Sequence, residues 1–256
     1  MFFAQKRLGV SYREFATNGY VMAEAQLNIR DTFGVDAITA CSDAFRITAD
    51  LGADMVFPEN QTPFAASPLV VSRGDLNKLA HPDPFDPKSR MNDRIRATQE
   101  MVRAVGDTCL VLGWVDMPLA EACSVCGVSA FMLMLYDDPL LAHQLLEYLT
   151  SIVIDFCLAQ LAVGTPMIGA GDAAASLLSP KLYREFALPY EQRDAALCIK
   201  RAEWLSCISV ATRHISWMIW CTRELICLMS ITRSIFLWLD VFTAGRKCVS
   251  KAISIR

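Results

Sequence analysis

The sequence predicts an α/β fold with a parallel sheet, and three observations support it. Short, continuously apolar segments alternate along the chain with longer segments of helical periodicity. Continuously apolar strands are typical of parallel sheets whose faces are covered by helices. With 256 residues, of which 54% are hydrophobic and 20% charged, the chain also has enough apolar side chains for one large core.

In the first hundred residues, glycine and capping residues separate the predicted elements. Ser11 opens a helix that Gly34 ends, and Ser42 and Asp43 offer N-cap oxygens for a helix that ends at Gly52. The segments between these helices are short, apolar and strand-like. We therefore expect helices over 11–33 and 42–51, strands over 36–41 and 53–57, and a polar loop over 58–68.

From Pro87 onward the alternation continues, with Pro at helix starts and Gly at breaks. Gly106 ends the next helix, Gly113 begins the exit loop of a strand, and Ser179 caps the last helix. We expect helices over 87–107, 119–135 (broken near Gly127), 139–163 and 179–193, and strands over 108–112 and 166–169.

These elements make four or five βα units. A closed (β/α)₈ barrel takes about 250 residues and eight units, so residues 1–193 do not make a whole barrel. A doubly wound sheet is the structural alternative, but no G-x-G-x-x-G follows any of the predicted strands.

The composition changes sharply at Arg193. Residues 1–193 contain all 11 prolines and 11 of the 12 glycines, whereas residues 194–256 contain five of the ten cysteines and four of the five tryptophans. A folded segment needs turn residues, which are nearly missing there. A membrane segment conflicts with the charges at Arg213, Arg223 and Arg233, because no uncharged run reaches about 18 residues. A helical extension lacks periodicity and caps.

A reading-frame error is the third account of this tail. Read from the third base of the Glu203 codon, codons permitted for 203–212 give Met-Val-Lys-Leu-His-Ile-Cys-Gly-Asn. The same shift turns 223–232 into Gly-Ala-Asp-Leu-Phe-Asn-Val-Asp-His and 249–256 into Lys-Gln-Gly-Asn-Ile-Asn-Pro. Three segments at one offset regain the missing Gly, Asp and Asn. We therefore interpret 1–193 as an incomplete barrel domain and 194–256 as a frameshifted, non-native tail.

Four segments together resemble one family. They are GVSYREFATN (9–18), FGVDAITACSD (33–43), GADMVFPENQTP (52–63) and GDAAASLLSPKLYREFALPYEQ (171–192). Over about residues 8–193 the chain resembles the uroporphyrinogen decarboxylase (URO-D) superfamily, closest to its methylcobamide:coenzyme M methyltransferase-like branch. The resemblance implies an α/β fold of the (β/α)₈ TIM-barrel type, which here is partial and incomplete at both ends.

The methyltransferase branch implies a catalytic zinc held by a His-x-Cys pair and a later Cys. A zinc-bound thiol becomes a thiolate that can accept a methyl group from a corrinoid. The shifted frame contains His-Ile-Cys at the expected place, but the chain as written has Ser206-Cys207-Ile208 there, and the later Cys would lie beyond residue 256. We therefore expect no metal site and no bound cofactor in this chain, with zinc and a corrinoid partner implied for the intact ancestor.

Four acidic residues at expected strand exits are the candidate site residues. Asp43 matches the residue with which the decarboxylases contact pyrrole N–H groups, and Asp172 follows the strand at 166–169; we expect these two to be catalytic. Asp116 and Glu59 are the candidates for substrate binding. Asp43 could instead cap a helix, and Asp172 could instead cap a turn. Cys123 and Cys126 form a C-x-x-C pair, for which burial as small apolar residues is favoured over a metal or redox role.

These patterns favour a protein derived from a corrinoid-dependent methyltransferase and inactive as written. One alternative is a uroporphyrinogen III decarboxylase, although the Arg-Gln-Ala-Gly-Arg motif of those enzymes is missing; another is a non-catalytic remnant that binds a corrinoid protein. A small thiol or a tetrapyrrole would be the substrate. The net charge of −3 argues against nucleic acid. We expect no membrane partner and, because no secretory signal is evident and the thiols suit a reducing compartment, a cytoplasmic location.

Overall fold

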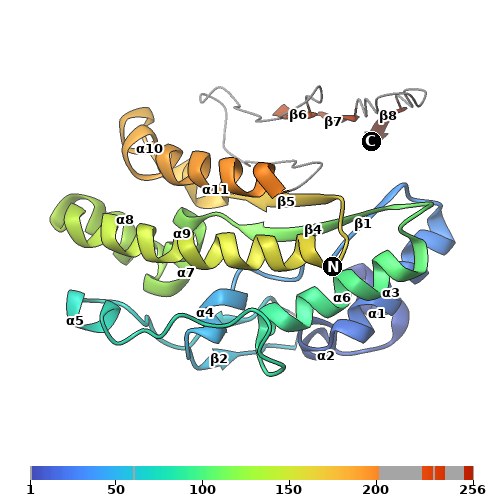
Figure 1. The fold of residues 1–256 in the computed structure, drawn as a ribbon, viewed down its shortest axis with the longest axis horizontal. Coiled ribbons are helices and arrows are strands. Elements are labelled where there is room, and N and C mark those ends of the chain that lie inside the picture. The colour runs from blue at the N-terminus through green and yellow to red at the C-terminus, as the bar shows by residue number, and fades with distance from the viewer. Residues whose placement is uncertain (1, 60, 202–226, 233, 240–250, 256) are drawn as a thin grey trace.

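The computed structural model describes residues 2–59, 61–201, 227–232, 234–239 and 251–255. At its centre a parallel sheet has the strand order β1-β4-β5, with β4 paired to both neighbours (Figure 1). The three strands are β1 (Ala37–Thr39), β4 (Leu110–Asp116) and β5 (Met167–Gly171). The parallel sheet predicted from the sequence is confirmed.

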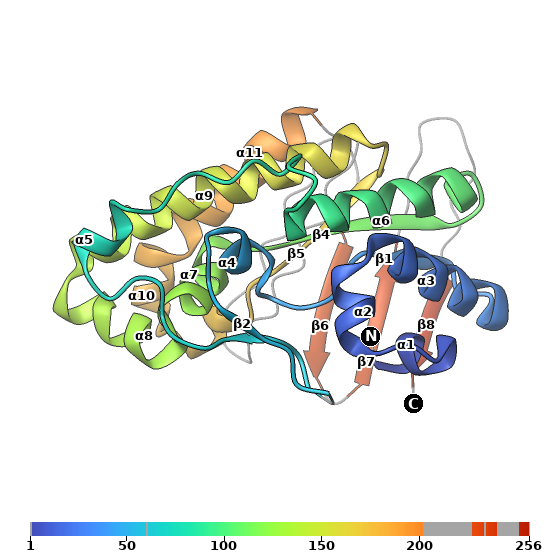
Figure 2. The same ribbon diagram turned by 90° about the horizontal axis from the view of Figure 1, so that it is seen from below.

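The long helices follow the same order as the strands. α3 contacts α6, α6 contacts α9 and α9 contacts α11, and in Figure 2 α6 and α9 lie on the same side of β4. Adjacent strands and helices that both follow chain order are typical of a (β/α)₈ barrel, whereas a doubly wound sheet reverses its strand order. These residues therefore form part of a barrel. The helices named here are α3 (Gly19–Phe33), α6 (Arg90–Val105), α9 (Pro139–Ala162) and α11 (Leu188–Arg201).

Shorter helices complete the layer. They are α1 (Phe2–Leu8), α2 (Tyr12–Thr17), α4 (Arg46–Asp50), α5 (Arg73–Leu76), α7 (Pro118–Cys126), α8 (Val128–Asp137), the 3₁₀ helix η1 (Ala173–Leu177) and α10 (Pro180–Phe186). Two apolar cores result. The larger lies among α7, α8, α9 and the strands β4 and β5, and the smaller lies among α1, α2, α3, α6 and β1.

Several of the predicted helix caps and helix ends are confirmed. Ser11 Oγ accepts a hydrogen bond from Glu14 N at 3.1 Å, as an N-cap does, and Ser179 Oγ caps α10. Gly34 has φ of 62° after α3, and Gly127 has φ of 82° between α7 and α8. A side chain at either glycine would strain this backbone, so both breaks depend on glycine.

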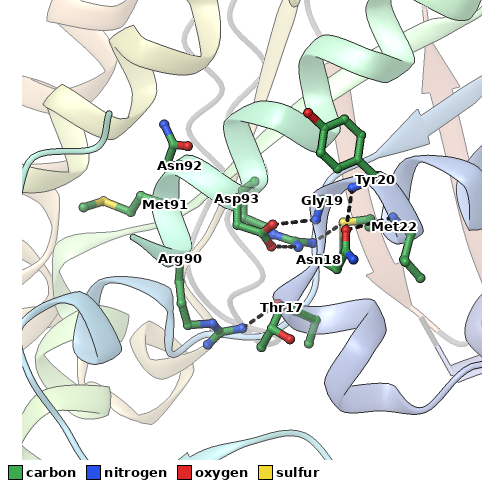
Figure 3. A network of polar contacts seen from close by, with 12 residues as sticks. Thr17, Asn18, Gly19, Tyr20, Met22, Arg90, Met91, Asn92 and Asp93 are labelled. Atoms are coloured by element: carbon green, nitrogen blue, oxygen red, sulfur yellow. Dashed lines mark hydrogen bonds and ion pairs between the residues drawn. The ribbon is translucent and has the colours of Figure 1, made fainter. Parts of the chain in front are cut away.

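Two predicted helices are each divided in two. The helix expected over 11–33 breaks at Asn18, whose extended backbone lets its side chain accept from Tyr20 N and Val21 N and so cap α3. The break lets Gly19 approach α6, where its N–H donates to Asp93 Oδ1 (Figure 3). The helix expected over 179–193 breaks at Ala187, between α10 and α11.

The strand expected over 53–57 does not belong to the parallel sheet. Its central part is β2 (Met55–Val56), which pairs antiparallel with β3 (Phe64–Ala65) in the segment expected to be a loop. The described residues therefore contain three parallel strands rather than the four or five βα units expected. β4 is longer than expected, because its pairing with β5 continues through Asp116.

α9 is long and apolar enough, by length and composition, to cross a membrane, but 56% of its most apolar window is buried inside the structure. Its buried residues include Leu145, Leu149 and Phe156 of the larger core. This helix is therefore a core helix of the α/β domain. A cytoplasmic location stays a prediction.

In the tail, β6 (Cys227–Thr232), β7 (Ser234–Leu239) and β8 (Lys251–Ile255) form an antiparallel sheet in that order. The position of the expected His-x-Cys motif, 206–208, lies outside the described residues. The frameshift interpretation of 194–256 therefore stays a prediction.

Candidate functional site

Three of the four candidate acids lie at or just after the carboxyl ends of neighbouring strands, at one edge of the sheet. Asp116 is the last residue of β4 and lies opposite Gly171 of β5, so Asp172 comes next in register. Asp43 follows β1, which pairs with the other side of β4. The carboxyl ends of parallel strands form the active-site face of a barrel, and this edge is here called the mouth.

Asp43 forms a two-pronged ion pair with Arg90, the first residue of α6. Arg90 Nη2 donates to Asp43 Oδ2 at 2.7 Å and Nη1 donates to Oδ1 at 3.0 Å. Burial of Asp43 opposes ionisation, but the hydrogen bonds and charge of Arg90 outweigh it and lower the pKa of Asp43 to about 2. Asp43 is therefore an ionised carboxylate whose two oxygens are both occupied.

The expectation that Asp43 caps the following helix needs correction. Its Oδ1 accepts from Phe45 N at 3.0 Å, but α4 begins only at Arg46 and its N-cap residue, Phe45, has no side-chain cap. The carboxylate closes the turn ahead of α4 rather than the helix itself. This turn is followed by Arg46, which reaches Asp116 at the mouth.

Arg46 is the first residue that sequence reasoning missed. Its side chain is 1% exposed, and its Nη2 donates to Asp116 Oδ2. Burial raises the pKa of Asp116, and the guanidinium of Arg46 opposes that rise. The pair ties the start of α4 to the end of β4, and so joins the exits of two neighbouring strands.

Glu121, in the first turn of α7, is the second residue that was missed. It is 1% exposed, and neither carboxyl oxygen has a hydrogen-bond partner among the residues that the structure describes. Burial raises the pKa of Glu121 well above its usual value, and the negative charge of Asp116 raises it further. We therefore assign Glu121 as a neutral acid beside the Arg46–Asp116 pair.

Asp172 lies fully buried beyond β5. Its Oδ1 accepts from Ala175 N at 3.3 Å, which is the capping contact expected as its alternative role. Burial raises the pKa of Asp172 well above its usual value, and the charge of Glu191 adds to this. Glu191 in turn accepts a hydrogen bond from Tyr183 Oη at 2.6 Å. Asp172 thus caps η1 with a carboxyl group whose protonated form is favoured by burial.

Glu59 does not join these residues. It is exposed in the connection between β2 and β3, whereas the mouth carboxyls are buried or nearly so. Its role in substrate binding stays a prediction.

Cys123 and Cys126 are buried in α7 as small apolar side chains, as expected. Burial raises the pKa of each thiol to about 12, so neither is a thiolate near neutral pH. Within the part of the chain that the structure describes, no three His, Cys, Asp or Glu side chains are placed to hold a metal ion. The positions at which the resemblance implies the first zinc ligands, 206–208, lie outside these residues, so the expectation about zinc stays a prediction.

Comparison with known proteins places this geometry in a family. The model of the family "Uroporphyrinogen decarboxylase (URO-D)" matches residues 2–218, which extends past Arg193. The uroporphyrinogen decarboxylase of Coxiella burnetii (strain RSA 493 / Nine Mile phase I) is 30% identical over 197 residues, which cover 75% of this chain and 54% of that protein. The one from Chlorobium phaeovibrioides (strain DSM 265 / 1930) is 32% identical over 173 residues, covering 66% and 48%.

The structure is similar to that of a methyltransferase from Methanosarcina mazei, with a TM-score of 0.70 and 20% sequence identity over 80% of this chain and 60% of that one. That similarity shows a shared fold. The chain spans about half the length of the curated relatives it matches. From the match over residues 2–218 and the carboxyl-lined barrel mouth, we conclude that this chain belongs to the uroporphyrinogen decarboxylase family.

Proposed function

We propose that this chain derives from a corrinoid-dependent methyltransferase, an enzyme that moves a methyl group from a methylcobamide to a thiol, and that it does not turn over as written. The observation that carries the proposal is the Asp43–Arg90 pair. Arg90 donates to both carboxylate oxygens of Asp43, and the Asp43 side chain is fully buried, so it does not present an oxygen to pyrrole N–H groups in this structure. The fold shared with a methyltransferase adds support.

In this proposal the mouth supplies fixed charges and protons. The Arg46–Asp116 and Arg90–Asp43 ion pairs hold two carboxyl groups in place. Burial raises the pKa of Asp172 and of Glu121, which favours their protonated forms, and a protonated carboxyl can donate a hydrogen bond. In the intact ancestor, the His-x-Cys motif would help to hold the zinc that activates the thiol.

Uroporphyrinogen III decarboxylation is the second candidate, and the curated relatives support it. It requires Asp43 to exchange Arg90 for the substrate. A non-catalytic remnant that docks a corrinoid protein is a third reading.

The test compares this chain with a version whose reading frame is corrected and extended. Both are assayed for methyl transfer from methylcobalamin to a thiol and for conversion of uroporphyrinogen to coproporphyrinogen. We expect methyl transfer only with the corrected chain, and decarboxylation with neither. Coproporphyrinogen formation by either chain would overturn the proposal in favour of the decarboxylase.

A further inference from the structure

Arg46 has hydrogen-bonding capacity that the protein does not use. Only Nη2 bonds to Asp116, while Nε and both hydrogens of Nη1 are buried and have no acceptor among the described residues. A buried, charged donor without an acceptor costs more than a lost neutral hydrogen bond. Such a site is expected to hold an acceptor that is not part of the chain.

Glu121 lies close enough to interact electrostatically with Arg46 and Asp116, and both of its buried carboxyl oxygens lack a partner in the described part of the chain. α7, which carries Glu121, contacts α4, which carries Arg46. The guanidinium donors of Arg46 on α4 and the carboxyl of Glu121 on α7 therefore both lack partners among the described residues, in the region where these two helices meet.

The charged groups around this place are two arginines, Arg46 and Arg90, and three acids, Asp43, Asp50 and Asp116. A protonated Glu121 adds an O–H donor, so an acceptor bound here would meet donors from both α4 and α7. The guanidinium donors of arginine suit a carboxylate, and hydrogen bonds to ionised groups are the strong ones.

We infer that Arg46 and Glu121 form a buried subsite for one carboxylate group of a small organic acid. Arg46 donates from Nε and Nη1, and the protonated Glu121 donates its O–H. This inference rests on the proposed function in one respect: the carboxylate belongs to the substrate that the mouth receives. Direct binding tests the subsite, so its failure leaves the methyl-transfer proposal standing.

The experiment titrates acetate into the full chain by isothermal calorimetry, with chloride at equal ionic strength as the reference. We expect saturable acetate binding that chloride does not reproduce. Arg46→Gln would orphan Asp116 and risk misfolding, so it is combined with Asp116→Asn. This double variant is expected to bind acetate at least about tenfold more weakly. Arg103→Gln, an exposed residue on α6, is the matched control and should bind like the wild type.

Glu121 supplies a second, independent readout. The titratable and charged groups facing it are Arg46 and Asp50 on α4, Asp116 on β4 and Asp43 after β1. When Glu121 ionises as pH rises, it repels the anion, so wild-type affinity should fall with rising pH. Glu121→Gln should bind acetate with an affinity that no longer changes with pH. Wild-type binding no stronger than that of the Arg46→Gln/Asp116→Asn variant, or an unchanged pH profile in Glu121→Gln, would overturn the inference and leave buried water as the occupant.

Discussion

Arg90, the first residue of α6, donates to both carboxylate oxygens of Asp43. Asp43 lies 47 positions earlier in the sequence, just after β1. Arg90 Nη2 also donates to the backbone oxygen of Ala16 at the end of α2. One guanidinium therefore joins the first strand exit, the α6 N-terminus and the N-terminal helices.

Removing Arg90 should destabilise the domain. Arg90→Met leaves Asp43, whose side chain is fully buried, as an uncompensated charge, and breaking a buried pair costs about 3–5 kcal/mol. Urea denaturation of the variant measures this loss. The double variant Arg90→Met/Asp43→Asn should recover part of it, and Arg103→Met should change stability little. A loss below about 1 kcal/mol for Arg90→Met would contradict a structural role for the pair.

The same pair should set the acid limit of stability. The pKa of Asp43 is about 2 in the folded chain and near its ordinary value of 3.8 when unfolded. Its stabilising contribution is therefore present above the unfolded value and is lost as pH falls from there towards about 2. Denaturation midpoints measured across this window should drop less steeply in Asp43→Asn than in the wild type. Equal slopes would show that Asp43 does not carry the effect.

Glu121 should act in the opposite direction. Its raised pKa means that the folded chain holds a proton which the unfolded chain has lost, so stability falls as pH rises above the ordinary glutamate value. Glu121→Gln removes this penalty. The variant should gain stability relative to wild type at pH 8 and gain less at pH 5, as measured by chemical denaturation. An equal gain in stability at both pH values would contradict the assignment of a neutral Glu121.

Gly19 should tolerate no side chain. A Cβ there would overlap the backbone oxygen of Asp93 on α6, at the contact shown in Figure 3. Gly19→Ala should therefore cost about 1–3 kcal/mol, because the two helices must separate. Gly74→Ala is the matched control: its Cβ would meet only Ser72 Oγ at 3.6 Å, an ordinary contact. Thermal unfolding of both variants tests the difference, and equal midpoints would show that α3 and α6 adapt.

The strand–helix order and the strand exits could be predicted from the sequence because they depend on local patterns. Asp43, Asp116 and Asp172 follow apolar strands, and parallel strands bring their carboxyl ends together. Arg46 and Glu121 could not be found this way, since a charged residue in a helical segment is usually solvated. Their burial depends on the packing of α4 and α7 against strands that are distant in sequence.

The two misplaced elements have similar causes. β2 resembles a parallel strand in composition, and only its partner Phe64–Ala65 makes it part of a hairpin. The break at Asn18, where that side chain caps α3, lets Gly19 contact Asp93 closely, and helical periodicity does not encode this contact. Pairing and close approach are properties of the folded chain rather than of one segment.

Sequencing of the coding DNA across the codons for residues 190–256 and onward distinguishes a shifted reading frame from a tail that is encoded as written. Descent from a corrinoid-dependent methyltransferase predicts that one base has been lost or gained, and that the corrected frame reads His-Ile-Cys-Gly-Asn after the helix that begins at Ser179-Pro180. A frame that stands as written would contradict that descent and move the non-catalytic remnant to the front.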